Sequence, residues 1–344
     1  MFGEYNKLNN ILLAVNICTY HRREFIENNI NKLLSLGFFD KNDNRHFGRM
    51  HIFITDNGSE IPIVNDEFLH IVHNRNNGGS GGFQRGLEEI RNSEIEFSHV
   101  IFMDDDVKFE DDLFYILYDF LCNVSDEYKD NPIAGRMLCM DKPEIQYTAA
   151  EVWNSGDIRH IEYMRDISGG DYEKGRVVYN SGAEYGGWWF CCYPMKYAAD
   201  NDVIPFFIHC DDVEYGLRCG RQPIIIEGVH VWHDTFVNRT TPLIKYYDLR
   251  NTLFVNEMHR CGAAPYDILT QWKHKISMPH MEKDYKSEYY LIKALNDYLR
   301  GTDWLYKIDS EKYHHKLEKK HTNRFFNSLL WRFVKYKFKK KYNI

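Results

Sequence analysis

The chain has 344 residues, of which 44% are hydrophobic and 15% aromatic, so it can bury a core and is not a disordered segment. No apolar stretch approaches the roughly 20 residues of a membrane span, and the N-terminus lacks the features of a signal peptide, which predicts a cytoplasmic protein. Residues 316–344 hold ten Lys or Arg and one acid (net +9), leaving 33 basic and 49 acidic residues (net −16) elsewhere.

The first third of the chain alternates short apolar runs with helical patterns. Helices are predicted at 24–36 and 83–91, and the buried strands are predicted at 11–17, 51–55, 69–72 and 99–103. This alternation predicts an α/β domain with a mostly parallel sheet, in which ligands bind at the carboxyl ends of the strands.

The rhythm continues with a helix at 113–122, a strand at 132–138 and one or two late strands within 223–232. Residues 141–187 are irregular and too long for a simple connection, which predicts an excursion that faces substrate. From about residue 262, helical patterns dominate.

Three consecutive carboxylates, Asp104, Asp105 and Asp106, follow the strand at 99–103. Adjacent anions repel one another, so a fold keeps them together where a cation or hydrogen-bond donors offset their charge. Hard divalent ions such as Mg²⁺ take oxygen ligands of this kind. The triplet alone fits a metal site and a solvated acidic loop equally well.

Two further segments stand at predicted strand ends. The glycine-rich run 77–82 begins at Asn77 and precedes a helix that carries Arg85; it suits close approach of a phosphate group, or else a flexible surface loop. Asp56, within Asp-Asn-Gly-Ser, can accept a hydrogen bond from a base or ribose, although such residues more often build turns.

Aromatic and acidic residues mark the later half. Trp188 and Trp189 follow a glycine pair, which suits an aromatic platform for a sugar ring, or else core packing. Asp211, Asp212 and Glu214 follow an apolar run, where carboxylates can serve as a general base or offset a helix dipole.

His233 lies at the end of the late strand, after His230 and Trp232. A single strand histidine is usually structural, but a histidine that joins two carboxylates around an ion completes a plausible ligand set.

The C-terminal segment 325–341 mixes large apolar residues with cations, which is typical of a helix on an anionic membrane surface. Nucleic-acid contact and a docked helix with solvated lysines are the alternatives. Trp331, Phe333 and Phe338 favour the membrane, and the acidic body argues against nucleic acid.

Taken together, these segments resemble the family-2 glycosyltransferases with a GT-A fold and, among them, the bacterial galactofuranosyltransferases. The resemblance spans roughly residues 11 to 260. It is carried, in order, by Cys-Thr-Tyr-His-Arg at 18–22, Thr-Asp-Asn-Gly-Ser at 55–59, the run 74–83, Phe-Met-Asp-Asp-Asp at 102–106, Gly-Trp-Trp-Phe at 187–190, Asp-Asp-Val-Glu-Tyr-Gly-Leu-Arg at 211–218 and Trp-His at 232–233.

The resemblance implies a role for each candidate residue. Asp104, Asp106 and His233 would hold Mn²⁺ or Mg²⁺ against the donor diphosphate. Asp212, or alternatively Asp211, would be the base that deprotonates the acceptor hydroxyl. The remaining residues would contact the donor (Asp56, Asn77, Arg85 and Asp105) or the acceptor (Trp188, Trp189 and Glu214).

The resemblance also implies a Rossmann-like GT-A domain over 1–260 that binds a nucleotide sugar, followed by a helical region with a basic amphipathic tail over 261–344. The expected reaction is inverting, metal-dependent transfer of galactofuranose from UDP-galactofuranose to a lipid-linked cell-surface glycan at the inner face of the membrane. Large polymerising members carry an extra N-terminal β-domain, so a chain that begins at the first strand is expected to add one or a few residues. Homo-oligomer formation stays open.

Three alternative functions are compatible with parts of this pattern. The same fold can take another donor, such as UDP-galactopyranose or dTDP-rhamnose. A non-catalytic glycan-binding protein on a degenerate transferase fold is a second hypothesis, against which the intact acid set argues. A two-metal phosphohydrolase would require a denser His/Asp cluster than the sequence offers.

Overall fold

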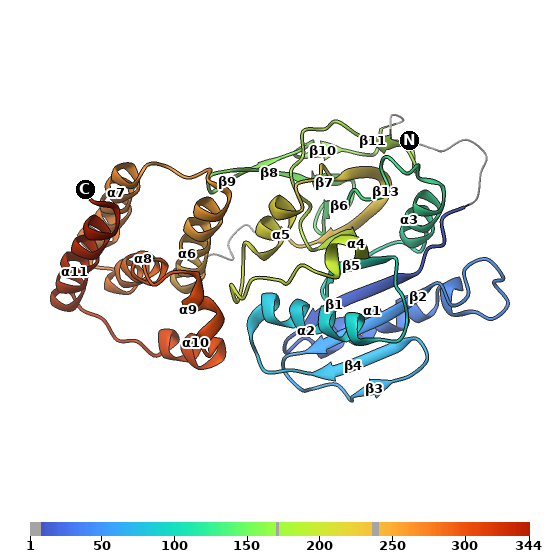
Figure 1. Cartoon of the computed structure of the whole chain (residues 1–344), viewed down its shortest axis with the longest axis horizontal. Coiled ribbons are helices and arrows are strands. Elements are labelled where there is room, and N and C mark those ends of the chain that lie inside the picture. The colour runs from blue at the N-terminus through green and yellow to red at the C-terminus, as the bar shows by residue number, and fades with distance from the viewer. Residues whose placement is uncertain (1–7, 170–171, 236–240) are drawn as a thin grey trace. The chain divides into compact units, whose positions relative to one another are not determined.

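The structure is a computed structural model that describes residues 8–169, 172–235 and 241–344 (Figure 1). Two compact units divide the chain. The first, here called the sheet unit, comprises the residues up to Trp153 together with Ile158–Val203 and Asp212–Thr235. The second, here called the helical unit, comprises Asn154–Asp157, Ile204–Asp211 and the residues from 236 onward.

Among the residues that the structure describes, an eleven-stranded sheet forms the centre of the sheet unit. Most of its strands follow the order β10-β7-β6-β12-β5-β1-β2-β4-β3, while β13 pairs with β6 and β11. Its strands are β1 (Leu13–Thr19), β2 (Met50–Asp56), β3 (Val64–Asn65), β4 (Leu69–His73), β5 (His99–Asp104), β6 (Ile133–Cys139), β7 (Ile145–Thr148), β10 (Arg165–Asp166), β11 (Val177–Val178), β12 (Phe190–Pro194) and β13 (Ile224–His233). A separate two-stranded sheet joins β8 (Glu151–Asn154) to β9 (Asp157–His160).

The central strands are parallel, as the sequence predicts. β4, β2, β1 and β5 are parallel neighbours, and β6 is parallel to β13. β12 runs antiparallel between β5 and β6. The carboxyl ends of β1, β2 and β5 therefore lie along one edge of the sheet, where the sequence places its candidate residues.

Helices cover both faces of this sheet. The core on one face includes apolar side chains of α1 (Arg23–Leu34), the short 3₁₀ helix η1 (Gly37–Phe39) and α3 (Asp112–Asn123). The core on the other face includes side chains of α2 (Gly78–Asn92), α4 (Met195–Ala198) and α5 (Asp211–Cys219). This α/β/α layering is that of the predicted fold class.

Two local expectations need correction. The glycine-rich run is not a loop before the helix, because α2 already begins at Gly78. The excursion 141–187 is not irregular throughout, since it contains the short strands β7 to β11. These strands are only two to four residues long, and all except β11 contain polar residues, so they lack the longer apolar alternation that would predict them.

The helical unit contains six helices in the part of the chain that the structure describes. They are α6 (Pro242–His259), α7 (Pro265–Glu282), α8 (Tyr285–Tyr298), α9 (Thr302–Lys307), α10 (Ser310–Glu318) and α11 (Arg324–Tyr342). α8 contacts α6, α7 and α11. None of the helices within the described residues combines the length and apolarity that a membrane crossing requires.

Candidate active site

The consecutive acids at the end of β5 make different contacts. Asp105 is buried, and its carboxylate accepts hydrogen bonds from Thr19 Oγ1 (2.6 Å) and Arg22 Nη1 (2.9 Å). Asp106 Oδ2 lies 2.7 Å from the same Arg22 nitrogen. Asp104 keeps 36% of its side chain exposed. Asp105 is therefore bound into the protein, whereas Asp104 is the most accessible of the three.

His233, the last residue of β13, meets the other two acids. Its Nε2 lies 3.2 Å from Asp106 Oδ1 and 3.7 Å from Asp104 Oδ2. One ligand atom from each of the three residues lies within 4.8 Å of the others. Carboxylate oxygens with one imidazole nitrogen are donors that suit Mn²⁺ or Mg²⁺. The structure thus brings together the three residues predicted as metal ligands, and their chemistry fits such an ion.

The electrostatics of this cluster favour a cation. Burial raises the pKa of the Asp104 carboxyl to about 8; His233 opposes the rise, and the neighbouring acids add to it. Burial alone would lower the pKa of His233, but the hydrogen bond to Asp106 and the charge of Asp104 outweigh it, and the pKa is raised. The protein's own groups therefore disfavour the ionised form of Asp104, and a divalent ion bound there would stabilise that form.

A backbone bridge explains why residues so distant in sequence meet here. Lys108, two residues beyond Asp106, exchanges hydrogen bonds with Trp232, the neighbour of His233. The bridge N–O distances are 2.9 Å from Lys108 N and 2.8 Å from Trp232 N. The segment after the acids is thereby joined to the end of β13.

Sequence reasoning missed Thr19 and Arg22, which hold Asp105 in place. The predicted parallel sheet could have indicated them, because β1 and β5 are parallel neighbours and Cys18 lies opposite Asp104. The turn after β1 must then lie beside the acid triplet. An arginine in that turn is the natural counter-ion for two adjacent carboxylates.

Glycines in the first half of α2 have a packing function. A Cβ on Gly82 would lie 2.9 Å from Cys18 Cβ, and a Cβ on Gly86 would lie 2.8 Å from Asn16 Cγ, so these glycines let α2 approach β1 closely. Asn77 is the N-cap residue, without a capping hydrogen bond from its side chain. Arg85 forms ion pairs with acids of its own helix, Glu88 and Glu89. Donor contacts for Asn77 and Arg85 remain predictions.

Asp56 is buried at the end of β2, and both of its oxygens are engaged. They accept hydrogen bonds from the backbone nitrogens of Gly58 (2.8 Å), Glu60 (2.6 Å) and Ile61 (2.9 Å). These are the contacts of a turn-building aspartate. A further contact with a nucleoside remains a prediction.

The two tryptophans do not form an exposed aromatic platform. Trp188 stacks on Phe102 with ring centroids 4.2 Å apart and an interplanar angle of 8°, and it is buried under the α2 face. Trp189 is buried on the opposite face, and its Nε1 donates to the carbonyl of Gly135 (2.8 Å). Successive residues beside a strand point to opposite faces, so each indole enters a different core. The platform interpretation is therefore wrong; a role in shaping the acceptor site stays a prediction.

The predicted base lies at the N-terminus of α5. Asp211 and Asp212 are its first two residues, and both are partly exposed. The helix packs through Tyr215 against Phe102 of β5, with ring centroids 5.6 Å apart. Asp104 lies two residues further along β5, so the helix with the candidate base packs beside the strand with the acids.

Glu214 differs from the two aspartates because it is buried. Its Oε2 lies 2.9 Å from Arg218 Nη2 on the same helix. That arginine also donates to the side chain of Asn201 (2.9 Å) and to the carbonyl of Asp202 (2.7 Å). This contact set describes a structural ion pair, and acceptor binding by Glu214 remains a prediction.

Comparisons with known proteins agree with this geometry. Residues 14–154 match the profile of the family described as Glycosyl transferase family 2. The chain is 29% identical over 259 residues to galactofuranosyltransferase GlfT2 of Mycolicibacterium smegmatis, covering 69% of this chain and 39% of that protein. It is 27% identical over 262 residues to GlfT2 of Mycobacterium tuberculosis, covering 69% and 40%. The chain spans about two fifths of the length of these curated relatives.

Among solved structures, residues 1–349 of TarS from S. aureus superpose with a TM-score of 0.50 at 12% identity, over 96% of this chain and 92% of that one. Residues 14–154 thus resemble a family 2 glycosyltransferase domain, and the fold is GT-A. Within that family the chain resembles the galactofuranosyltransferases. The predicted fold class and the predicted resemblance are confirmed.

Proposed function

We propose that the protein is an inverting, metal-dependent galactofuranosyltransferase that uses UDP-galactofuranose and extends a lipid-linked cell-surface glycan. The observation that carries the proposal is the cluster of Asp104, Asp106 and His233 at the carboxyl ends of β5 and β13. That cluster belongs to the same unit as the glycosyltransferase domain.

Asp104, Asp106 and His233 are the proposed ligands of Mn²⁺ or Mg²⁺. When bound, such an ion offsets the negative charge that develops on a diphosphate leaving group. Asp105 is a further proposed donor contact. Both of its oxygens accept hydrogen bonds from Thr19 and Arg22, so one of these side chains would have to move before Asp105 could bind a donor hydroxyl. Asp56, Asn77 and Arg85 are proposed donor contacts.

Asp212 is the proposed general base, with Asp211 as the alternative. In a single displacement the acceptor oxygen forms a bond to the anomeric carbon while the bond from that carbon to the donor phosphate oxygen breaks. The hydroxyl proton passes to the Asp212 carboxylate, and UDP leaves with its electron pair. One base suffices for this reaction because the leaving group needs no acid, unlike in glycoside hydrolysis.

The test is a transfer assay with the purified protein, Mn²⁺ and a lipid-linked galactofuranosyl acceptor. UDP-galactofuranose is expected to be consumed faster than UDP-galactopyranose or dTDP-rhamnose, and linkage analysis identifies the product. Asp212→Asn is expected to lower turnover by about 10²- to 10⁴-fold while UDP binding persists. Turnover equal to that of the wild type would show that Asp212 is not the general base. Preference for another donor would refute the galactofuranose assignment.

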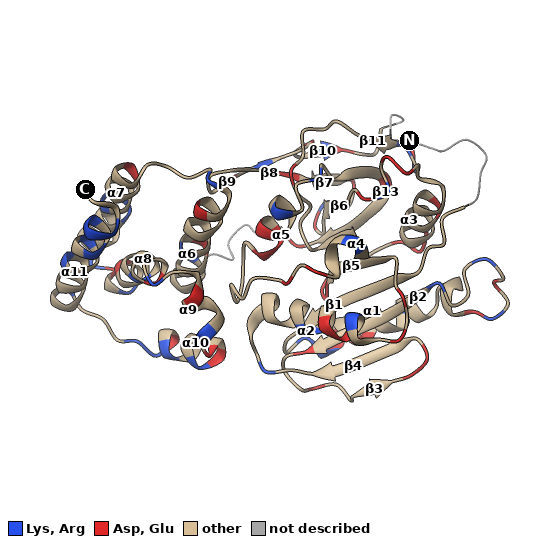
Figure 2. Ribbon diagram, viewed as in Figure 1, with Lys and Arg blue, Asp and Glu red and all other residues tan. Residues whose placement is uncertain are grey.

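Helix α11 supports the proposed association with the inner face of the cell membrane. Phe325, Leu329, Phe333 and Tyr336 are exposed and recur at helical spacing, and Lys and Arg are frequent along the same helix (Figure 2). Phe338 is buried, so the expectation that it faces the membrane is wrong.

α11 is nevertheless docked. Asn327 Nδ2 donates to the carbonyl of Tyr285 and to Glu288 Oε2, both at 2.8 Å, which leaves the apolar stripe on the opposite side. Vesicles with anionic headgroups are therefore expected to bind the protein, and neutral vesicles are not. Phe333→Ser should weaken cosedimentation, whereas Tyr306→Ser, an equally exposed aromatic on α9, should not. Equal binding of both variants would exclude α11 as the contact.

A further inference from the structure

Three aromatic rings cluster on the excursion between β6 and β12. Tyr147 lies on β7, His160 ends β9, and Tyr163 lies in the turn that follows. His160 and Tyr163 are stacked, with centroids 5.1 Å apart at 19°, and Tyr147 meets Tyr163 edge-on at 5.5 Å. Tyr163 remains 57% exposed, so the cluster presents an aromatic surface to solvent.

A buried carboxylate fixes the central ring. Glu151 is 2% exposed, and its Oε2 lies 2.7 Å from His160 Nδ1. The other ring nitrogen of His160 lies 3.4 Å from the hydroxyl of Tyr147. The imidazole is thus held from both sides, and its orientation fixes the ring of Tyr163 that stacks on it.

The turn that carries Tyr163 has an unfavourable backbone. Its neighbours Glu162 (φ 50°) and Met164 (φ 53°) both adopt the left-handed region that residues with side chains rarely occupy. Such conformations persist where surrounding contacts over-determine them, and they are frequent at binding sites.

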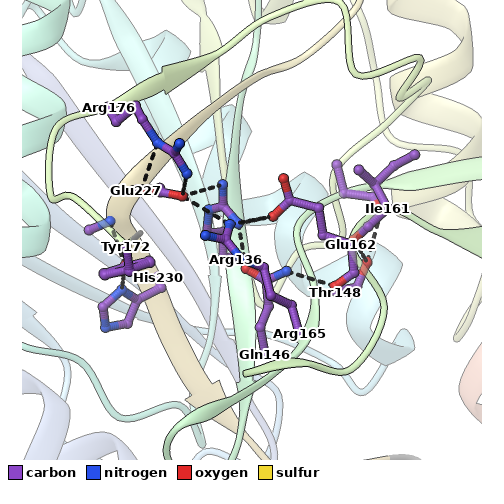
Figure 3. A network of polar contacts seen from close by, with 12 residues as sticks. Arg136, Gln146, Thr148, Ile161, Glu162, Arg165, Tyr172, Arg176, Glu227 and His230 are labelled. Atoms are coloured by element: carbon purple, nitrogen blue, oxygen red, sulfur yellow. Dashed lines mark hydrogen bonds and ion pairs between the residues drawn. The ribbon is translucent and has the colours of Figure 1, made fainter. Parts of the chain in front are cut away.

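A polar network that includes Glu162 anchors that turn (Figure 3). Arg136, fully buried on β6, lies between Glu227 and Glu162 and donates to Glu162 Oε2 (2.6 Å). Arg165 donates to the same oxygen (2.9 Å), and the side-chain amide of Gln146 donates to the carbonyl of Glu162 (2.9 Å). The turn that carries the exposed ring of Tyr163 is therefore held by ion pairs, including one from the buried Arg136. Core packing alone does not require this arrangement.

The ring cluster lies on the same sheet face as the candidate metal ligands. Tyr147 packs into the core that also contains Val231 of β13, and alternation along that strand puts His233 on the face of Val231. His233 pairs with Cys139 of β6, and β7 is the next strand beyond β6. From β13 across β6 to β7 there are two strand spacings, and the two residues are also slightly offset along the strands. The backbones of Tyr147 and His233 are therefore about 10 to 12 Å apart.

We propose that Tyr163, with Tyr147 and His160, forms a sugar-binding subsite for a remote residue of the acceptor glycan. The apolar face of a sugar ring stacks on an exposed aromatic ring, and the hydroxyls of the two tyrosines can hydrogen-bond its hydroxyls. The separation from the metal ligands is of the order that a short oligosaccharide spans. This subsite rests on the proposed function and specifies which acceptors the site prefers: those long enough to reach Tyr163.

The experiment compares acceptors of two lengths. A galactofuranosyl disaccharide and a tetrasaccharide with the same aglycone are assayed with UDP-galactofuranose and Mn²⁺. Tyr163→Ala is expected to raise KM for the tetrasaccharide about three- to tenfold. KM for the disaccharide, kcat and acceptor-free hydrolysis of the donor should stay unchanged. Tyr163→Trp should restore KM, and Ile158→Ala, an exposed apolar residue on β9, is the matched control. An unchanged KM for the tetrasaccharide in Tyr163→Ala overturns the subsite.

Failure of the donor assignment is recognised separately. If the wild-type protein neither hydrolyses nor transfers from UDP-galactofuranose, binding of the same tetrasaccharide is measured by saturation-transfer NMR. Binding that Tyr163→Ala removes supports the subsite although the proposed reaction fails. Equal signals from the two proteins, or none from either, overturn the subsite.

Discussion

The close approach of α2 to β1 can be tested by adding one methyl group. A Cβ at position 86 would lie 2.8 Å from Asn16 Cγ and would overlap the amide oxygen, so the buried Asn16 side chain must move. It would then lose its hydrogen bond to the carbonyl of Phe83 (2.9 Å). Overpacking costs about 1–3 kcal/mol and an unpaired buried amide a similar amount, while alanine returns about 1 kcal/mol of helix propensity. Gly86→Ala should therefore destabilise the sheet unit by about 3 kcal/mol.

The matched control lies on the same helix. A Cβ at Gly79 would meet no heavy atom within 4 Å, so Gly79→Ala should leave stability unchanged or raise it by up to about 1 kcal/mol. Urea unfolding is followed by tryptophan fluorescence, which includes Trp188 packed against Phe83 of α2 (centroids 5.1 Å apart). Replacing Asn16 with Ala in the Gly86→Ala background should recover part of the loss, as a double-mutant cycle.

The same pair of variants separates packing from ligand approach. If a donor phosphate approaches the N-terminus of α2, Gly79→Ala should weaken UDP binding without loss of stability, and calorimetric titration with UDP measures this. A Gly86→Ala protein that unfolds within 0.5 kcal/mol of the wild type would refute the packing argument. So would a Gly79→Ala protein that is destabilised equally.

Other residues give further predictions. His233→Gln should weaken Mn²⁺ binding at least tenfold in calorimetric titrations, because it removes one of three candidate ligands; unchanged affinity would exclude His233 from the metal site. Asp104→Asn should preserve or slightly raise thermal stability, because burial and the neighbouring acids already disfavour the charged form of Asp104, whereas Asp105→Asn should lower it because two donors lose a charged acceptor. If thermal melts give the reverse order, Asp105 is not the structural member of the triplet. Burial lowers the pKa of His99 to about 4, so the unfolded protein binds more protons than the folded one between pH 6.5 and 4. Stability should fall as the pH drops through that range, by up to about 3 kcal/mol from this residue. His99→Gln should make the free energy of unfolding, measured in urea at each pH, less dependent on pH. Equal pH dependence in the variant and the wild type would show that His99 is not the group responsible.

Much of the central fold could be predicted because its strands are mostly apolar. β1, β2, β5 and β6 are almost wholly buried, and such strands give continuous hydrophobic runs. β12 is equally buried, but nothing local indicates that it runs antiparallel between β5 and β6. Such long-range pairing depends on contacts that a sequence pattern does not record.

The candidate site could be predicted where residues mark the ends of strands, and less well where burial decides the role. Asp104, Asp106 and His233 each lie at or just beyond a strand end, and the structure brings them together. Trp188 and Trp189 lie just before β12, between two cores, and their burial depends on which neighbours cover each face. A sequence shows an aromatic residue but not the layer that encloses it.

The acid triplet also shows why one motif can contain both structural and functional residues. Asp105 is paired with Thr19 and Arg22 on the β1 side, so its charge is offset within the protein. Arg22 also contacts Asp106. Asp104 keeps about a third of its side chain exposed, and burial together with the neighbouring acids raises its pKa. A cluster stabilised wholly by the protein would have paired all three carboxylates. The incomplete compensation at Asp104, beside His233, is what a divalent cation would complete, and that asymmetry argues for a metal site more strongly than the motif itself.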